Sequence, residues 1–184
     1  MIINWYGGGC YKVQASMMNI VVDPDTSAGS GGRLKGELVL KTRVPAPVDI
    51  NNVVEGEITV PGEYEISGVR IKGVMLPSDG DELKTAFRVV VDDLALGFLG
   101  NASSELSEKV LESLGEIDVL FIPSNDISGK LVKAVAPKVA VPGWGDPARA
   151  MADIGQKPEP QDKIVIKKKD LESEEGFRLI VLKQ

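Results

Sequence analysis

The chain has 184 residues, 43% of them hydrophobic and 26% charged, which is typical of a soluble globular protein and predicts one domain over residues 1–184. Its 21 basic and 27 acidic residues give a net charge of −6, which argues against a protein that binds nucleic acid by neutralising phosphates. There is no histidine and one cysteine, Cys10, which excludes intrachain disulfides, ordinary structural zinc sites and every histidine-dependent triad. No apolar run is long enough to span a bilayer, and the first residues lack the pattern of a signal peptide, so we expect a cytoplasmic protein without a membrane partner.

The first half of the chain predicts short strands separated by tight turns. The β-rich segments are residues 2–6, 10–15, 19–22, 37–42, 64–66, 69–76, 85–91 and 94–99. Ser67-Gly68 and Asp92-Asp93 are expected to be the turns of two hairpins. Asp23–Gly32, rich in glycine and serine, predicts a surface loop, and Lys41–Ile50 (KTRVPAPVDI) is expected to be a loop because it holds two prolines.

The second half alternates helices with strands. The expected helices are residues 104–114, 128–135 and 147–154, and the expected strands are residues 117–123, 138–141, 164–168 and 177–182. Asp146-Pro147 provides an N-cap followed by proline in the first helical turn. The last two strands are expected to form a charged terminal hairpin around a polar turn. Many strands followed by helix–strand alternation predict mixed sheets covered by helices.

Seven short motifs follow one another with consistent spacing. They are INWYGGGCYKV, IVVDP, ELVLKT, VPGEYEISGVRIKGV, LGFLGN, IDVLFIPS and PKVAVPGW. In this order, from about Ile2 to Trp144, the chain resembles the metallo-β-lactamase superfamily, specifically its short branch of lactonase-like zinc-dependent hydrolases; PGEYEISG is the most distinctive motif. The resemblance implies an α/β (α+β) fold, a four-layer αββα sandwich of two mixed β-sheets. It places the metal ions at one edge, on loops that follow strands.

The resemblance also implies that the metal-binding side chains are missing. In the family, the strand that matches ELVLKT runs into the zinc signature T-H-x-H-x-D-H, of which Thr42 is retained here. The residues at the former metal-site positions are Gly8, Arg43, Pro45, Pro47, Val48, Asn101 and Trp144. Arginine repels a divalent cation, and proline and valine side chains offer no donor atom. We therefore expect no metal, no cofactor and no catalytic residue of the family's kind.

Three residues could bind a ligand in the former metal pocket. Arg43 could attract an anion, Asp23 matches a family position that supports the metal site, and Ser78 falls near a further family histidine. The simpler interpretations are that Arg43 pairs with Asp23 or Asp49, and that Asp23 is a turn residue that caps local amides.

Other polar residues have plain structural explanations. Cys10 is expected to be a buried thiol, and Glu63 and Glu65 alternate along a strand toward solvent. Gly7–Gly9 is expected to be a tight connection between strands, because no helix follows that would complete a phosphate-binding loop.

The leading hypothesis is a metal-free, non-catalytic protein of the metallo-β-lactamase fold that acts in binding, scaffolding or assembly. Its partner would be an unknown small molecule or protein, and assembly into a homo-oligomer or with an active relative stays open. The alternatives are a hydrolase-like enzyme with a rebuilt, zinc-independent site, formed from Arg43, Asn101, Ser78 or Asp23, and a small-anion binding protein. We also expect four residues to meet in the former metal site as a small apolar core. They are Trp144, Pro45, Pro47 and Val48.

Overall fold

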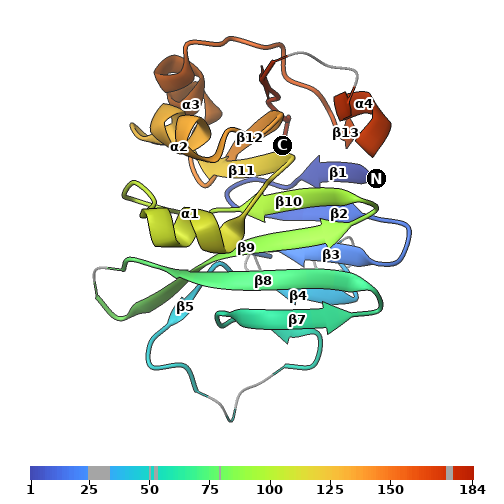
Figure 1. The fold of residues 1–184 in the computed structure, drawn as a ribbon, viewed down its shortest axis with the longest axis vertical. Coiled ribbons are helices and arrows are strands. Elements are labelled where there is room, and N and C mark those ends of the chain that lie inside the picture. Colours follow the sequence, from blue (N-terminus) through green and yellow to red (C-terminus); the bar gives the residue numbers. More distant parts are fainter. Residues whose placement is uncertain (25–33, 50, 52–53, 79, 173–175) are drawn as a thin grey trace.

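Two mixed β-sheets pack face to face in this computed structural model, which describes residues 1–24, 34–49, 51, 54–78, 80–172 and 176–184 (Figure 1). The first sheet has the strand order β13-β1-β2-β3-β4-β6. Its strands are β1 (Ile2–Trp5), β2 (Tyr11–Gln14), β3 (Asn19–Val22), β4 (Leu38–Leu40), β6 (Glu57–Ile58) and β13 (Ile164–Val165). The sheets are those of an α+β sandwich, as expected.

The second sheet has the order β14-β12-β11-β10-β9-β8-β7, with β5 paired to β9. Its strands are β5 (Arg43–Pro45), β7 (Gly62–Ile66), β8 (Val69–Leu76), β9 (Glu82–Val91), β10 (Leu94–Phe98), β11 (Val119–Pro123), β12 (Val139–Gly143) and β14 (Arg178–Leu179). Strands β10, β11 and β12 run parallel and are buried along their whole length. Such continuous burial explains their unbroken apolar sequences, because both faces of these strands are covered.

Both expected hairpins form. Strands β7 and β8 pair antiparallel, as do β9 and β10. Asp92 and Asp93 have φ values of 52° and 61°, and Ser67 and Gly68 have values of 49° and 79°. Two successive residues at positive φ are the geometry of the two-residue turns whose twist matches that of the strands.

The helices begin and end close to the boundaries that the capping residues predicted. They are α1 (Glu108–Leu114), α2 (Ser128–Val135), α3 (Pro147–Ile154) and α4 (Lys168–Glu172). Helix α1 begins later than expected because Ser107 is its N-cap, accepting a hydrogen bond from the Val110 amide. Asp146 caps α3 in the same way, and Gly155 ends it in a left-handed conformation. Helices α1, α2 and α3 pack against β8, β11 and β12, so they cover the second sheet.

The expected terminal hairpin is wrong. Strand β13 pairs with β1 of the first sheet, whereas β14 pairs with β12 of the second, and the residues between them include α4. Each strand extends the nearer edge of a different sheet, which satisfies edge hydrogen-bonding groups that a separate hairpin would leave exposed.

Lys41–Ile50 is also more ordered than expected, because its residues 43–45 form β5 antiparallel to β9. Proline is tolerated there, since β5 is an edge strand and needs no ladder hydrogen bond from that residue. Most of the loop expected at residues 23–32 lies outside the described residues.

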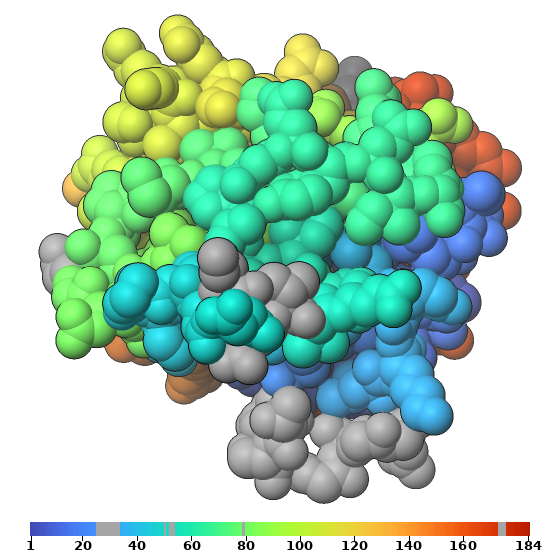
Figure 2. Space-filling view, turned by 90° about the horizontal axis from the view of Figure 1, so that it is seen from below, coloured from blue at the N-terminus to red at the C-terminus, as the bar shows by residue number. Residues whose placement is uncertain are grey.

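The core has two parts. One fills the space between the sheets and includes Ile3, Tyr11 and Phe121; the other lies between the second sheet and the helices and includes Leu120 and Leu131. Cys10 is buried and Glu63 and Glu65 are exposed, as expected. Seen from below, the described segments 34–49 and 54–76 form much of the surface (Figure 2). In the part of the chain that the structure describes, no helix is long and apolar enough to cross a membrane.

Candidate functional site

A cleft of about 380 Å³ lies where loops that follow strands of both sheets come together. Its lining residues are Gly8, Gly9, Asp23, Pro24, Lys41, Thr42, Arg43, Asn101 and Trp144. They follow β1, β3, β4, β10 and β12 along the chain. Four of the seven former metal-site positions named above, Gly8, Arg43, Asn101 and Trp144, therefore share one cleft.

Asp23 follows β3 and is the carboxylate of the cleft. Its Oδ1 accepts a hydrogen bond from the Thr42 amide at 2.7 Å, and its Oδ2 accepts one from the Thr42 hydroxyl and one from Nε1 of Trp144, the latter at 2.7 Å. Burial raises the pKa of Asp23, while the hydrogen bonds from Thr42 and Trp144 and the charge of Arg43 act in the opposite direction. The expectation that Asp23 caps local amides is wrong, because these partners lie 19 and 121 residues away in sequence.

Trp144 is held in place from two directions. Its backbone has a φ of 47°, and its amide donates to the Gly8 carbonyl at 2.8 Å. Its ring lies 5.6 Å from that of Tyr11, which in turn packs on Phe121 at 4.7 Å. Tyr11 is fully buried and donates its hydroxyl hydrogen bond to the Pro142 carbonyl at 2.9 Å. The packing of Trp144 on Tyr11, and of Tyr11 on Phe121, orients the indole toward Asp23.

Two glycines allow the close approaches on which the cleft depends. A Cβ on Gly9 would lie 2.0 Å from Nε1 of Trp144, so only glycine leaves room for the indole. Gly100 has a φ of 61°, and a Cβ there would lie 2.6 Å from Oγ1 of Thr42. The run of glycines at residues 7–9 was the sequence signal for this packing, but its partner could not be read from the sequence.

Two cations flank Thr42 on the chain. Lys41 forms an ion pair with Glu57, with 2.6 Å between Nζ and Oε2. Arg43 is 55% exposed, and its Nε lies 3.6 Å from Oε1 of Glu82. The expected pairing of Arg43 with Asp23 or Asp49 is thus replaced by a loose pair with Glu82. This difference arises because β5 places Arg43 beside the start of β9.

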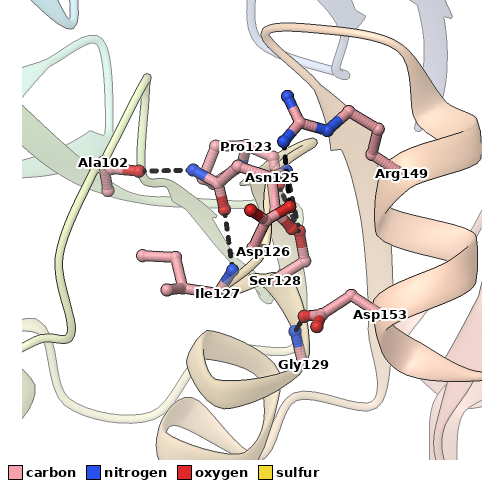
Figure 3. Close-up of polar contacts among 9 residues, drawn as sticks. All are labelled: Ala102, Pro123, Asn125, Asp126, Ile127, Ser128, Gly129, Arg149 and Asp153. Carbon is pink, nitrogen blue, oxygen red and sulfur yellow. Dashed lines mark hydrogen bonds and ion pairs between the residues drawn. The ribbon is translucent and has the colours of Figure 1, made fainter.

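Asn101 reaches the cleft from the loop after β10, and a polar network that includes the next residue, Ala102, holds that loop (Figure 3). The side-chain amide of Asn125 donates to the Ala102 carbonyl at 2.9 Å, and its Oδ1 accepts from the Ile127 amide at 3.2 Å. The buried Ser128 hydroxyl donates to the Pro123 carbonyl at 2.8 Å. Sequence reasoning missed Asn125, which follows the β11 motif IDVLFIPS directly.

The same network ties α2 to α3 (Figure 3). Asp153 accepts a hydrogen bond from the Gly129 amide at 2.7 Å, and Arg149 pairs with Asp126 at 2.9 Å. Helices α2 and α3 are therefore joined by polar contacts as well as by apolar packing.

A model of the family described as "Beta-lactamase superfamily domain" matches residues 2–142. The chain belongs to the β-lactamase superfamily. A comparison with curated proteins finds no match.

Several solved structures share the fold. A protein from Thermotoga maritima assigned to the Zn-dependent hydrolases of the metallo-β-lactamase superfamily aligns with a TM-score of 0.77 at 20% identity, covering 98% of this chain and 97% of its own. The metallo hydrolase Igni18 from Ignicoccus hospitalis aligns with a TM-score of 0.66 at 15% identity, covering 90% and 99%. An isothiocyanate hydrolase from Delia radicum gut bacteria aligns with a TM-score of 0.67 at 10% identity, covering 91% and 100%. At these identities the likeness shows the fold alone.

The other three residues expected at former metal-site positions lie outside the cleft. Pro45, Pro47 and Val48 line a separate hollow of about 270 Å³, and both prolines are exposed. The expected apolar core with Trp144 is wrong, because the β5–β9 pairing leads this segment away from the cleft. Ser78 is not among the lining residues of the cleft, although its Oγ is buried without a hydrogen-bond partner in the described part of the chain.

The residues of the cleft do not fit a zinc ion. Within the described ranges, no group of three or more cysteine, aspartate and glutamate residues could hold a metal. Of the described residues that line the cleft, Asp23 is the one with a carboxylate, and both of its oxygens accept hydrogen bonds. The indole of Trp144 offers an N–H and no lone pair, and Arg43 brings a positive charge.

Proposed function

We propose that this superfamily member is metal-free and non-catalytic and that it binds a small ligand in the cleft. The observation that carries the proposal is the hydrogen bond from Trp144 to Asp23, which satisfies the carboxylate beside a cleft of about 380 Å³ that stays open. That volume falls within the range of small-molecule binding sites, roughly 300–1,000 Å³. Polar groups from several loops converge on it, as they do in such sites.

The donor set supports binding over the hydrolysis for which the family is known. Zinc hydrolases use the metal to lower the pKa of a bound water toward neutrality. In this chain Arg43 and Trp144 stand at two of the former ligand positions, and Gly8 at a third, so the cleft has no equivalent means of activating water. Asp23, the remaining candidate base, accepts hydrogen bonds from the Thr42 amide and hydroxyl and from Trp144.

Metal analysis tests the proposal directly. The purified, tag-free protein should contain far less than one equivalent of zinc, iron or manganese per chain. Its melting temperature should be the same with a strong chelator as with micromolar zinc, because a metal that binds only the folded chain would raise it. About one equivalent of metal per chain, or a reproducible rise of several degrees with zinc, would overturn the proposal.

One observation favours the alternative of an enzyme with a rebuilt, zinc-independent site. A buried carboxyl whose pKa is raised, in a cleft, is a feature of general acids and bases, and Asp23 has it. A panel of lactone, ester and phosphate-ester substrates tests this alternative. Turnover that is lost in Asp23→Asn, and retained in the matched surface variant Asp126→Asn, would favour the enzyme.

The proposal includes three properties of the whole protein. Residues 1–184 would form one domain, the protein would work in the cytoplasm, and its role could extend to scaffolding or to assembly with a partner or a second copy. Light scattering at several protein concentrations measures the last of these.

A further inference from the structure

We propose that the ligand of this cleft is a small organic anion, with a carboxylate or a phosphate group, which Arg43 and Asn101 bind. The inference rests on the proposed function, in which the cleft binds a ligand. It adds the chemical class of that ligand and the residues that recognise it.

The first argument is the sign of the charge in the cleft. The chain as a whole has a net charge of −6, yet among the described residues two cations, Lys41 and Arg43, line the cleft beside one carboxylate, that of Asp23. Asp23 directs its oxygens to Thr42 and Trp144. Both of its oxygens therefore already have hydrogen-bond donors within the protein.

The second argument is that, among the described residues, Arg43 and Asn101 have side-chain N–H groups that are free to donate hydrogen bonds to a ligand. Arg43 contacts Glu82 at 3.6 Å between Nε and Oε1, which is longer than a hydrogen bond. A guanidinium presents paired N–H groups that match a carboxylate or a phosphate. Asn101, on the opposite loop, is exposed, and within the described residues its side chain makes no hydrogen bond. These two side chains can therefore donate to one ligand without breaking an existing hydrogen bond.

The third argument concerns the counterions. Glu57 and Glu82 pair with the two cations, but neither lines the cleft. A ligand anion would compete with them for the same positive charge. The pair of Lys41 with Glu57 is short, at 2.6 Å, whereas that of Arg43 with Glu82 is long, so Arg43 is the cation that an anion engages more readily.

This competition predicts opposite changes in ligand affinity when either member of the Arg43–Glu82 ion pair is replaced. Isothermal titration of the full chain with malonate, and separately with inorganic phosphate, measures the affinity. Arg43→Gln should weaken binding about tenfold or more, because it removes a charge-assisted contact. Glu82→Gln should strengthen binding several-fold, because it removes the competing carboxylate. Both variants lose the same ion pair, so a shared loss of stability cannot explain opposite changes in affinity.

Two further variants sharpen the result. Asn101→Ala should weaken binding several-fold, whereas Arg70→Gln should leave it unchanged, because Arg70 is exposed on β8 and lines a different hollow. Binding should also weaken with added salt, since exposed charges are screened. Binding of malonate alone would assign the site to carboxylates, and binding of phosphate alone would assign it to phosphate groups.

Three outcomes overturn the inference. They are the absence of binding by either anion, equal binding of the neutral analogue malonamide, and a change of the same sign in Arg43→Gln and Glu82→Gln. A protein that stays metal-free but shows any of these outcomes loses the anion inference and keeps the proposed function. A protein that takes up stoichiometric zinc loses the proposed function itself.

Discussion

Nε1 of Trp144 donates a hydrogen bond to Oδ2 of Asp23 at 2.7 Å. Trp144 follows β12 of the second sheet and Asp23 follows β3 of the first, so this one bond joins segments that follow strands of the two sheets. The resemblance to zinc hydrolases places both positions around the metal site. In this chain an indole and a carboxylate make the connection directly.

Truncation of Trp144 should be costly. Trp144→Ala removes a partly buried ring and leaves the Asp23 carboxylate short of a donor, so we expect a loss of about 2–4 kcal/mol of unfolding free energy. Trp144→Phe keeps most of the packing on Tyr11 and loses the N–H, so its cost should be smaller, about 1–2 kcal/mol. Denaturant unfolding of both variants measures the difference. Equal costs would mean that the packing of the ring contributes nothing, whereas a Trp144→Phe variant as stable as the wild type would mean that the hydrogen bond contributes nothing.

Addition of a single methyl group at Gly9 should displace the indole. A Cβ there would lie 2.0 Å from Nε1 of Trp144, so Gly9→Ala must move the ring or the backbone. We expect a loss of about 1–3 kcal/mol, as for other overpacked sites, and a change in tryptophan fluorescence. Gly68→Ala is a control for the fluorescence change alone, because a Cβ at Gly68 meets nothing within 4 Å but its φ of 79° strains the backbone and costs stability. An unchanged fluorescence spectrum for Gly9→Ala would contradict the packing described above.

The ionisation of Asp23 should make stability depend on pH. Its pKa in the folded protein is raised above the usual 3.8, so the folded state holds this proton more tightly than the unfolded chain. The contribution of Asp23 to stability is then full below pH 3.8 and is lost as pH rises through the raised value. Asn does not titrate, so the stability of the wild type minus that of Asp23→Asn should fall as pH rises from 3.8 through the raised pKa of Asp23. A difference that rises with pH would show that the pKa is lowered instead.

Asn125 should stabilise the loop that presents Asn101. Asn125→Ala removes the hydrogen bonds to the Ala102 carbonyl and from the Ile127 amide, and we expect a loss of about 1–3 kcal/mol. Hydrogen exchange should increase in residues 99–103. In Asp126→Ala, which loses an exposed ion pair with Arg149, the cost should stay within about 0–1 kcal/mol, without faster exchange in that loop.

Much of the fold could be predicted because its signals are local. The turns at Ser67-Gly68 and Asp92-Asp93, and the caps Asp146 and Gly155, depend on the conformational preferences of single residues and their neighbours. The C-terminal strands could not be predicted in the same way. β13 and β14 are short, and their pairing with β1 and β12 depends on which sheet edge is nearest in space.

The absence of histidine excludes a metal site with histidine ligands without any structure, because the donor atoms of a side chain are fixed by the residue type. The resemblance carried by the sequence also predicted that Arg43 and Trp144 stand at former ligand positions. Only the tertiary structure decided that Pro45, Pro47 and Val48 lie away from Trp144, and that Asp23 bonds to an indole 121 residues distant. Such contacts depend on how the two sheets pack and on the small space that Gly9 leaves because it has no Cβ. No local pattern of residues encodes either of these.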